Sequence, residues 1–142
     1  MEPDKDVKTT DINNLFTRER ADQGAWLDIK DLFGKDTGVR LKLAGGHSER
    51  FRRAMAKAQA EQANRSKARG SRDVTVEDSM LEFDLMSNVL ADVTLEWNAT
   101  SEGKPYDLTF ERAKAVYENA PDVRRQAFAF ITDARNHFLS QS

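Results

Sequence analysis

The side chains that could do chemistry are few in this chain and far apart. Neither His47 nor His137 has an acidic residue or a second histidine at ligand spacing on a shared helical face. A metal site needs several converging donors, and the chain has no cysteine to supply thiolate ligands. We therefore predict no metal site and no cofactor, and we interpret both histidines as ordinary surface or capping residues.

The acidic residues give no catalytic pattern either. Glu82 and Asp84 do not form a facing i, i+4 pair on a helix, and neither do Asp28 and Asp31. Because the chain has 24 acidic residues, neighbouring carboxylates arise often by chance. We interpret these pairs as solvated surface and not as a general acid and base.

Nucleophile and phosphate motifs are also missing from the sequence. Ser79 and Ser87 lack the Gly-x-Ser-x-Gly context that exposes a nucleophilic serine. The pair Gly45-Gly46 is not followed by the Lys-Ser or Lys-Thr of a phosphate-binding loop. We therefore predict that the protein is not an enzyme, and binding is the first hypothesis for its function.

Positive charge is concentrated in one segment. Residues 50–72 hold eight Lys or Arg and one acid, Glu61, in a chain whose net charge is −2. Cations along one helix can neutralise phosphates, so a small nucleic-acid-binding protein is the alternative function. Its contacts would be Arg50, Arg53, Lys57, Arg65, Lys67 and Arg69. The acidic total and the lack of aromatic residues between Met55 and Arg72 speak against this alternative.

The chain length and the distribution of apolar residues predict the domain organisation. The 142 residues fit one domain with its own core. No apolar run resembles a signal peptide or a membrane span, so we expect a soluble cytoplasmic protein. Residues 1–9 have almost no apolar side chains and are predicted to be a flexible tail, followed by a single helical domain over residues 10–142.

Helical spacing of apolar residues begins after the tail. A short N-terminal helix is predicted with Ile12, Leu15 and Phe16 on one face, closed by Gly24. A second helix, capped by Ser48, carries an apolar stripe that ends at Ala58. Residues 59–73 are polar and are predicted to form a helical extension or a loop.

The second half of the chain predicts three more helices. The first is apolar and runs to Trp97, the second follows a cap at Thr109, and the third runs from Pro121 to Phe138. Residues 98–107, with Gly103 and Pro105, are interpreted as a turn region.

Two segments near the N-terminus alternate in polarity instead. In residues 39–43, Val39, Leu41 and Leu43 face one way and the two basic residues between them the other. Together with residues 26–29 and a glycine-containing linker, they predict a β-hairpin. Two strands alone are marginal in water, so the apolar face must pack on helices or pair with another chain. The predicted fold class is mainly α, with about five helices in one compact domain and a small N-terminal β-hairpin.

The helix that runs to Trp97 is apolar on two sides. Phe83, Met86, Leu90 and Val93 form one stripe with Trp97, while Leu81, Leu85 and Val89 lie nearly opposite at 100° per residue. Such a helix is either buried all round or shares one side with a partner. In the second case the partner-binding residues would be Leu81, Leu85, Val89, Phe128, Phe51 and Met55.

Three segments, in this order, give the chain a family resemblance. They are residues 11–21 (Asp-Ile-Asn-Asn-Leu-Phe-Thr-Arg-Glu-Arg-Ala) with Trp26-Leu27-Asp28-Ile29, the stretch Phe51-Arg52-Arg53-Ala54, and the ending from Ala120-Pro121 to Phe138. With these segments the chain resembles the tail assembly chaperones of long-tailed (siphovirus-type) bacteriophages over most of residues 11–139.

The resemblance implies a small, mainly helical protein without enzymatic activity, which acts in the host cell cytoplasm and is absent from the finished virion. Its implied partner is the tape measure protein, which such chaperones coat and keep soluble during tail assembly. In many members a translational frameshift yields a longer product whose extension recruits the tail tube protein. This chain would correspond to the shorter product, and a homo-oligomer is left open.

Overall fold

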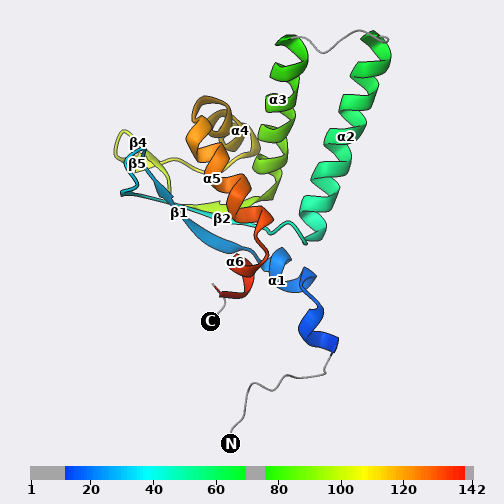
Figure 1. Ribbon diagram of the computed structural model, residues 1–142. Helices are drawn as coiled ribbons and strands as arrows, with labels where there is room; N and C mark the ends of the chain where they lie inside the picture. The colour runs from blue at the N-terminus through cyan, green and yellow to red at the C-terminus, as the bar shows by residue number, and fades with distance from the viewer. Residues whose placement is uncertain (1–11, 70–75, 140–142) are drawn as a thin grey trace, which may run out of the picture.

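The computed structural model describes residues 12–69 and 76–139, without the side chains of residues 14, 66, 68, 69, 76–83, 138 and 139. The helical elements are the 3-10 turn η1 (Ile12–Leu15), α1 (Arg18–Gln23), α2 (Glu49–Arg69), α3 (Val76–Val93), α4 (Phe110–Asn119), α5 (Pro121–Thr132) and α6 (Arg135–Leu139). In Figure 1, α2 and α3 rise side by side as a long hairpin from a body made of the sheet and the C-terminal helices.

The body is organised around an antiparallel sheet. The strands are β1 (Ala25–Lys30), β2 (Asp36–Leu43), β3 (Thr94–Trp97), β4 (Thr100–Ser101) and β5 (Lys104–Pro105). β1, β2 and β3 pair in that order, and β4 and β5 form a separate two-stranded ribbon. Leu27 pairs with Leu41, and Leu41 with Trp97, so one face of the sheet is apolar.

The opposite face of the sheet is polar, as the alternation in residues 39–43 predicts. There Arg40 lies opposite Asp28 and binds its carboxylate at 2.8 Å, and Lys42 lies opposite Glu96 at 3.4 Å. The predicted β-hairpin is therefore confirmed, with its apolar face on the helices. Trp26 lies on the polar face, half-buried, and the Arg40 guanidinium covers its ring.

The predicted fold class, mainly α with about five helices, is wrong. The described residues form a mixed α and β fold with six α-helices, a three-stranded sheet and a two-stranded sheet. The error lies at Thr94, where the helix predicted to reach Trp97 ends and β3 begins. The spacing of Leu90, Val93 and Trp97 is helical, but the segment pairs with β2 instead. This third strand gives the hairpin the neighbour that two strands need for stability.

The closing helix is also divided. The sequence predicts one helix from Pro121 to Phe138, whereas α5 ends at Thr132 and α6 begins at Arg135. Between them the Asp133 carboxylate accepts hydrogen bonds from the backbone amide and the guanidinium of Arg135. The Asp133 carboxylate therefore satisfies the first backbone amide of α6, and α6 contacts α1.

Four of the predicted helix boundaries are confirmed, although the predicted N-terminal helix is divided into η1 and α1. Gly24 closes α1 with a φ of 85°, a conformation that favours glycine. The Ser48 hydroxyl accepts the Phe51 amide at 2.9 Å, the Thr109 hydroxyl caps α4, and Pro121 opens α5. Local sequence therefore places these boundaries correctly.

The polar segment over residues 59–73 continues α2 as far as Arg69. Of the two predicted alternatives, a helical extension or a loop, the structure has a helix over residues 59–69. Residues 70–73, and the tail predicted over residues 1–9, lie outside the described residues.

The core fills the space between the apolar face of the sheet and α3, α4 and α5. Its members are Ile29, Leu41, Leu43, Ala44, Leu90, Ala91, Val93, Ala113, Tyr117, Ala127 and Ile131. Tyr117 is the largest of them, and its hydroxyl lies 2.7 Å from Thr94 Oγ1, which in turn donates to the Leu90 carbonyl at 2.8 Å. Burial raises the pKa of the Tyr117 phenol to about 12.

Candidate binding site

Two of the predicted partner-binding residues belong to the packed interior. Leu85 is 7% exposed and Val89 is 1% exposed, as expected if α3 is buried all round. The Leu81 side chain lies outside the described residues. Leu85 and Val89 nevertheless line a groove in the α2–α3 hairpin, which is the candidate site.

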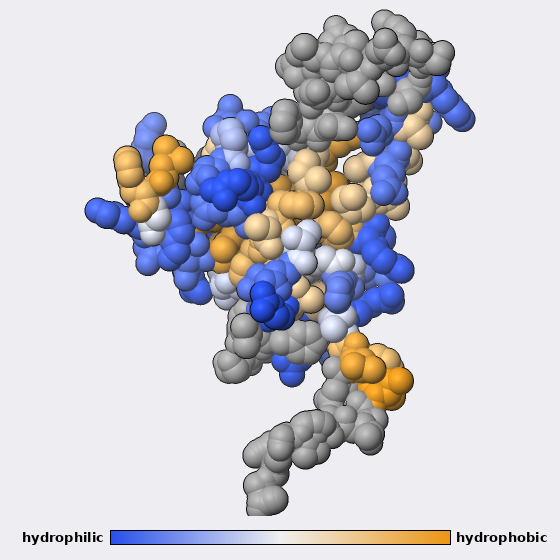
Figure 2. Space-filling model, in the orientation of Figure 1, coloured by the Kyte–Doolittle hydropathy of each residue, from blue (hydrophilic) through white to orange (hydrophobic). Residues whose placement is uncertain are grey.

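The groove runs between the facing sides of α2 and α3 and has a volume of about 220 Å³. Its lining residues are Met55, Ala58, Gln59 and Gln62 from α2 and Leu85, Met86 and Val89 from α3. Figure 2 shows apolar atoms in the region between these helices and hydrophilic side chains along the outer side of α2. We call this cavity the hairpin groove.

The sequence of α2 explains why the groove is open. Ala58, the shortest of the four α2 residues that line the groove, leaves space toward α3, and residues 59–65 are exposed. The two methionines at the groove, Met55 and Met86, are half-buried. Methionine has a flexible, polarizable side chain, so it suits a surface that must accept differently shaped apolar groups.

The remaining predicted partner residues lie in different places. Phe51 is half-buried at the base of α2 and packs against the core. Phe128 lies on α5, 38% exposed, and does not line the hairpin groove. Of the predicted set, the structure therefore brings together Met55, Leu85 and Val89.

A second cavity of about 340 Å³ lies on the α4 side of the hairpin and shares Ala58 and Leu85 with the groove. It contains Phe110, which is 39% exposed. Charged pairs line it: Lys57 lies 3.8 Å from Asp92, and Lys114 lies 3.4 Å from Asp84.

Asp84, an acid of this cavity, also affects Glu118, which lies four residues after Lys114 on α4. A hydrogen bond with the Asp84 carboxyl group raises the pKa of Glu118, and Lys114 opposes that effect. Among the described residues, the buried Asn88 Oδ1 atom has no hydrogen-bond partner. The cavity is therefore polar and largely charge-compensated, and it suits an apolar partner less well than the hairpin groove does. The partners of Asp84 and Asp92 could not be recognised in the sequence, because Lys114 and Lys57 lie on other helices.

The predicted nucleic-acid contacts are partly neutralised. Arg50 donates to the Asp92 carbonyl at 2.9 Å, Lys57 lies near the Asp92 carboxylate, and Arg65 binds Glu61 at 2.8 Å. Arg53 and Lys67 are exposed, and the Arg69 side chain lies outside the described residues. Lys57 and Arg65, which lie beside acids, are less available to phosphates than free cations are.

The prediction that both histidines are surface or capping residues is wrong for His137. Its side chain is only 2% exposed, and its Nε2 atom donates to the Leu43 carbonyl at 3.0 Å. Among the described residues, the buried Nδ1 atom has no partner. Burial lowers the pKa of His137, the Leu43 carbonyl opposes this, and nearby His47 lowers it further. His47 is exposed, as predicted, with its Nδ1 atom 2.6 Å from the Thr17 hydroxyl.

His137 is a structural residue of the joint between α6 and the sheet. Its ring packs on Phe130 with the ring centroids 5.5 Å apart. A methyl group at Gly45 would lie 3.0 Å from its Nδ1 and Cε1 atoms, so only glycine fits there without a shift. The sequence could not reveal this, because Leu43 and His137 are 94 residues apart.

The described residues give no competing assignment, and neither do the comparisons with known proteins. Within residues 12–69 and 76–139, apart from the side chains that the structure does not describe, no group of three or more His, Asp or Glu residues could hold a metal ion. In the same residues, no helix has the length and apolarity required to cross a membrane. No protein-family model, curated protein or solved structure matches the chain.

Proposed function

We propose that this protein is a phage tail assembly chaperone that binds apolar stretches of the tape measure protein in the hairpin groove and keeps that protein soluble. The observation that carries the proposal is the groove itself, in which Met55 and Met86 face an open cavity from opposite helices. The resemblance in sequence supplies the identity of the partner.

The composition of the groove suits a long helical client. A tape measure protein presents many different apolar side chains along its length, so its chaperone must accept varied shapes at similar affinity. Methionine-lined surfaces can repack around such groups. An amphipathic helix offers anchors at i, i+3, i+4 and i+7, and a groove between two helices receives such a row.

The open packing of α2 supports the same proposal. Residues 59–65 are exposed along α2, so this part of the helix is held by few buried apolar contacts. Elements with little buried apolar surface open at low free-energy cost. In this proposal α2 shifts away from α3 to admit the client helix, while the sheet and α5 stay fixed.

The proposal includes the wider role implied by the resemblance. The protein acts without enzymatic activity in the host cytoplasm, and a longer frameshift product brings the tail tube protein to the coated tape measure. Nucleic acid has no part in this role.

Co-expression with the proposed client, a tape measure protein, tests the proposal. We expect the tape measure protein to appear in the soluble fraction, bound to this chain, when both are made together. When it is made alone, we expect it to precipitate. Equal precipitation with and without this chain would refute the proposed function.

A further inference from the structure

The three-stranded sheet has an open edge at β1. Within the described residues β1 pairs only with β2, which pairs in turn with β3, so the outer side of β1 has no neighbouring strand. A strand at the edge of a sheet presents backbone N–H and C=O groups that no second neighbour satisfies. The direction in which each residue of β1 points these groups decides which of them are open.

The backbone groups of β1 point alternately toward β2 and away from it. The Ile29 carbonyl accepts a hydrogen bond from a β2 hydroxyl at 2.8 Å, whereas the amide and carbonyl of Lys30 face Gln126 on α5. Because neighbouring residues of a strand face opposite sides, Asp28 and Trp26 point their backbone groups the same way as Lys30. The register irregularity beyond Asp28 lies in β2, where four steps match two along β1, so the alternation in β1 is unbroken.

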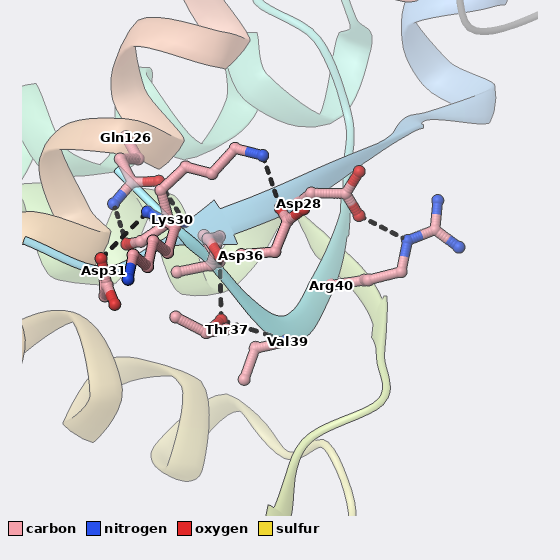
Figure 3. A network of polar contacts seen from close by, with 10 residues as sticks. Asp28, Lys30, Asp31, Asp36, Thr37, Val39, Arg40 and Gln126 are labelled. Carbon is pink, nitrogen blue, oxygen red and sulfur yellow. Dashed lines mark hydrogen bonds and ion pairs between the residues drawn. The ribbon is translucent and has the colours of Figure 1, made fainter. Parts of the chain in front are cut away.

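One position of this edge is already filled by an amide. The Gln126 Oε1 atom accepts the Lys30 amide and its Nε2 atom donates to the Lys30 carbonyl, both at 2.9 Å, as Figure 3 shows. A side-chain amide offers the same donor and acceptor as a peptide group. The edge therefore binds an amide group in this protein, and a peptide chain would continue the row from Gln126 toward Trp26.

The side chains beside the open edge define what such a chain must carry. Leu27 is half-buried and packs against the core on the apolar face of the sheet. On the polar face the Asp28 carboxylate is held by Arg40 at 2.8 Å, and that guanidinium also covers the Trp26 ring. Because these charges are compensated, the edge has no excess charge that would attract a highly charged segment. It favours apolar residues alternating with small polar ones, with an apolar residue beside Leu27.

We propose that the open edge of β1, at Trp26 and Asp28, binds an extended segment of another protein as an added strand. The segment pairs with β1 through backbone hydrogen bonds and ends where Gln126 occupies the edge. In this mode of recognition the main chain provides affinity and alternate side chains provide selectivity. Each of the two outward-facing residues offers one N–H and one C=O, so binding is weak and suits a transient contact. The inference is independent of the hairpin groove, which lies between α2 and α3.

Amide hydrogen exchange followed by NMR tests the proposal. The probe is a capped hexapeptide of alternating valine and threonine, extended by a lysine for solubility. At ~1 mM peptide, where weak contacts become populated, we expect the Trp26 and Asp28 amides to exchange at least ~2-fold more slowly, as half occupancy of the edge requires. The Leu27 amide faces β2 by the same alternation, and its exchange should not change. A peptide with N-methylated amides cannot donate and should protect neither Trp26 nor Asp28.

A proline variant removes the outward donor and leaves the pairing with β2 intact. In Asp28→Pro the lost N–H points away from β2, a position where an edge strand tolerates proline. Asp28→Ala is the matched control, since it also loses the ion pair with Arg40 but keeps the amide. We expect Asp28→Ala to bind the peptide like the unmodified chain and Asp28→Pro to bind it at least ~10-fold more weakly. Circular dichroism should show the same fold in both.

Three results would overturn the inference. The first is equal binding of the peptide by Asp28→Pro and Asp28→Ala when both are folded. The second is unchanged exchange of the Trp26 and Asp28 amides in the unmodified chain with peptide present, a result that does not depend on the folding of any variant. The third is slower exchange of these amides as the concentration of the chain alone rises, which would assign the edge to a second copy instead of another protein.

Discussion

The side-chain amide of Gln126 binds the backbone of Lys30 as a neighbouring strand would. Its Oε1 atom accepts the Lys30 amide and its Nε2 atom donates to the Lys30 carbonyl, both at 2.9 Å. These two bonds cover the end of edge strand β1 and hold α5 against the sheet. An edge strand without such cover offers its backbone to other chains.

Gln126→Ala should lower the free energy of unfolding by about 1–2 kcal/mol, because two hydrogen bonds to the backbone are lost. Urea denaturation measures the change. Gln126→Glu keeps the length of the side chain but cannot donate to the Lys30 carbonyl. It should lower the free energy of unfolding by at least as much as Gln126→Ala does. Unchanged stability in both variants would mean that the paired bonds contribute nothing.

Tyr117→Phe should destabilise the protein by about 1 kcal/mol through loss of the hydrogen bond to Thr94, while the aromatic ring still fills the core. Thermal unfolding monitored by circular dichroism measures the effect. Tyr106→Phe is the matched control, since the Tyr106 ring is half-buried and stacks on Trp97. The hypothesis fails if the two variants are equally stable.

The burial of His137 predicts a loss of stability in mild acid. Its pKa in the folded protein is lowered, so as pH falls below the ordinary value of about 6.5 the unfolded chain takes up the proton first. The free energy of unfolding should therefore be constant above about pH 7.5 and decline from about pH 6.5 downward. The stabilisation that comes from the neutral His137 ring is lost below the pKa of His137 in the folded protein.

His137→Gln removes this titration but leaves an amide that can donate to the Leu43 carbonyl. The dependence of unfolding free energy on pH between about 7 and 5 should become shallower in this variant, before most carboxylates begin to titrate. His47→Gln, at the exposed histidine, should keep most of the slope. If His137→Gln retains the full slope, another group is responsible.

Several features could be predicted from the sequence because they depend on nearby residues. The caps at Ser48 and Thr109, the start of α5 at Pro121 and the β1–β2 hairpin follow from local composition and spacing. β3 could not be recognised, because Val93 and Trp97 fall at helical spacing and four residues are too few to reveal alternation. β3 pairs with β2, which lies far from it in the sequence.

The candidate site was only partly predictable for the same reason. Met55 is correctly included among the candidate residues, since it lies on the apolar stripe of α2. Met86 faces it across the groove but belongs to the other predicted stripe of α3, so the sequence alone does not join them. Leu32 and Phe33 follow β1 directly after Asp31, and only the structure shows that nothing covers them within the described residues.

The basic residues of α2 predict a negative result with nucleic acid. Because Arg50, Lys57 and Arg65 are engaged with Asp92 and Glu61, we expect no gel shift of DNA or RNA at ~0.1 M salt, where binding driven by phosphate contacts should be visible. A shift at that salt that disappears as salt rises would revive the alternative of a nucleic-acid-binding protein.

The central claim is that the hairpin groove holds the client helix, and a binding titration with purified tape measure fragments tests it most directly. Met55→Asp places a charge in the groove, and Ala56→Asp places the same charge at the next, exposed position of α2. We expect Met55→Asp to weaken binding at least ~10-fold, equivalent to ~1.4 kcal/mol, and Ala56→Asp to bind like the unmodified chain, with equal helicity in both. Equal affinities of the two variants would contradict the assignment of the groove as the binding site.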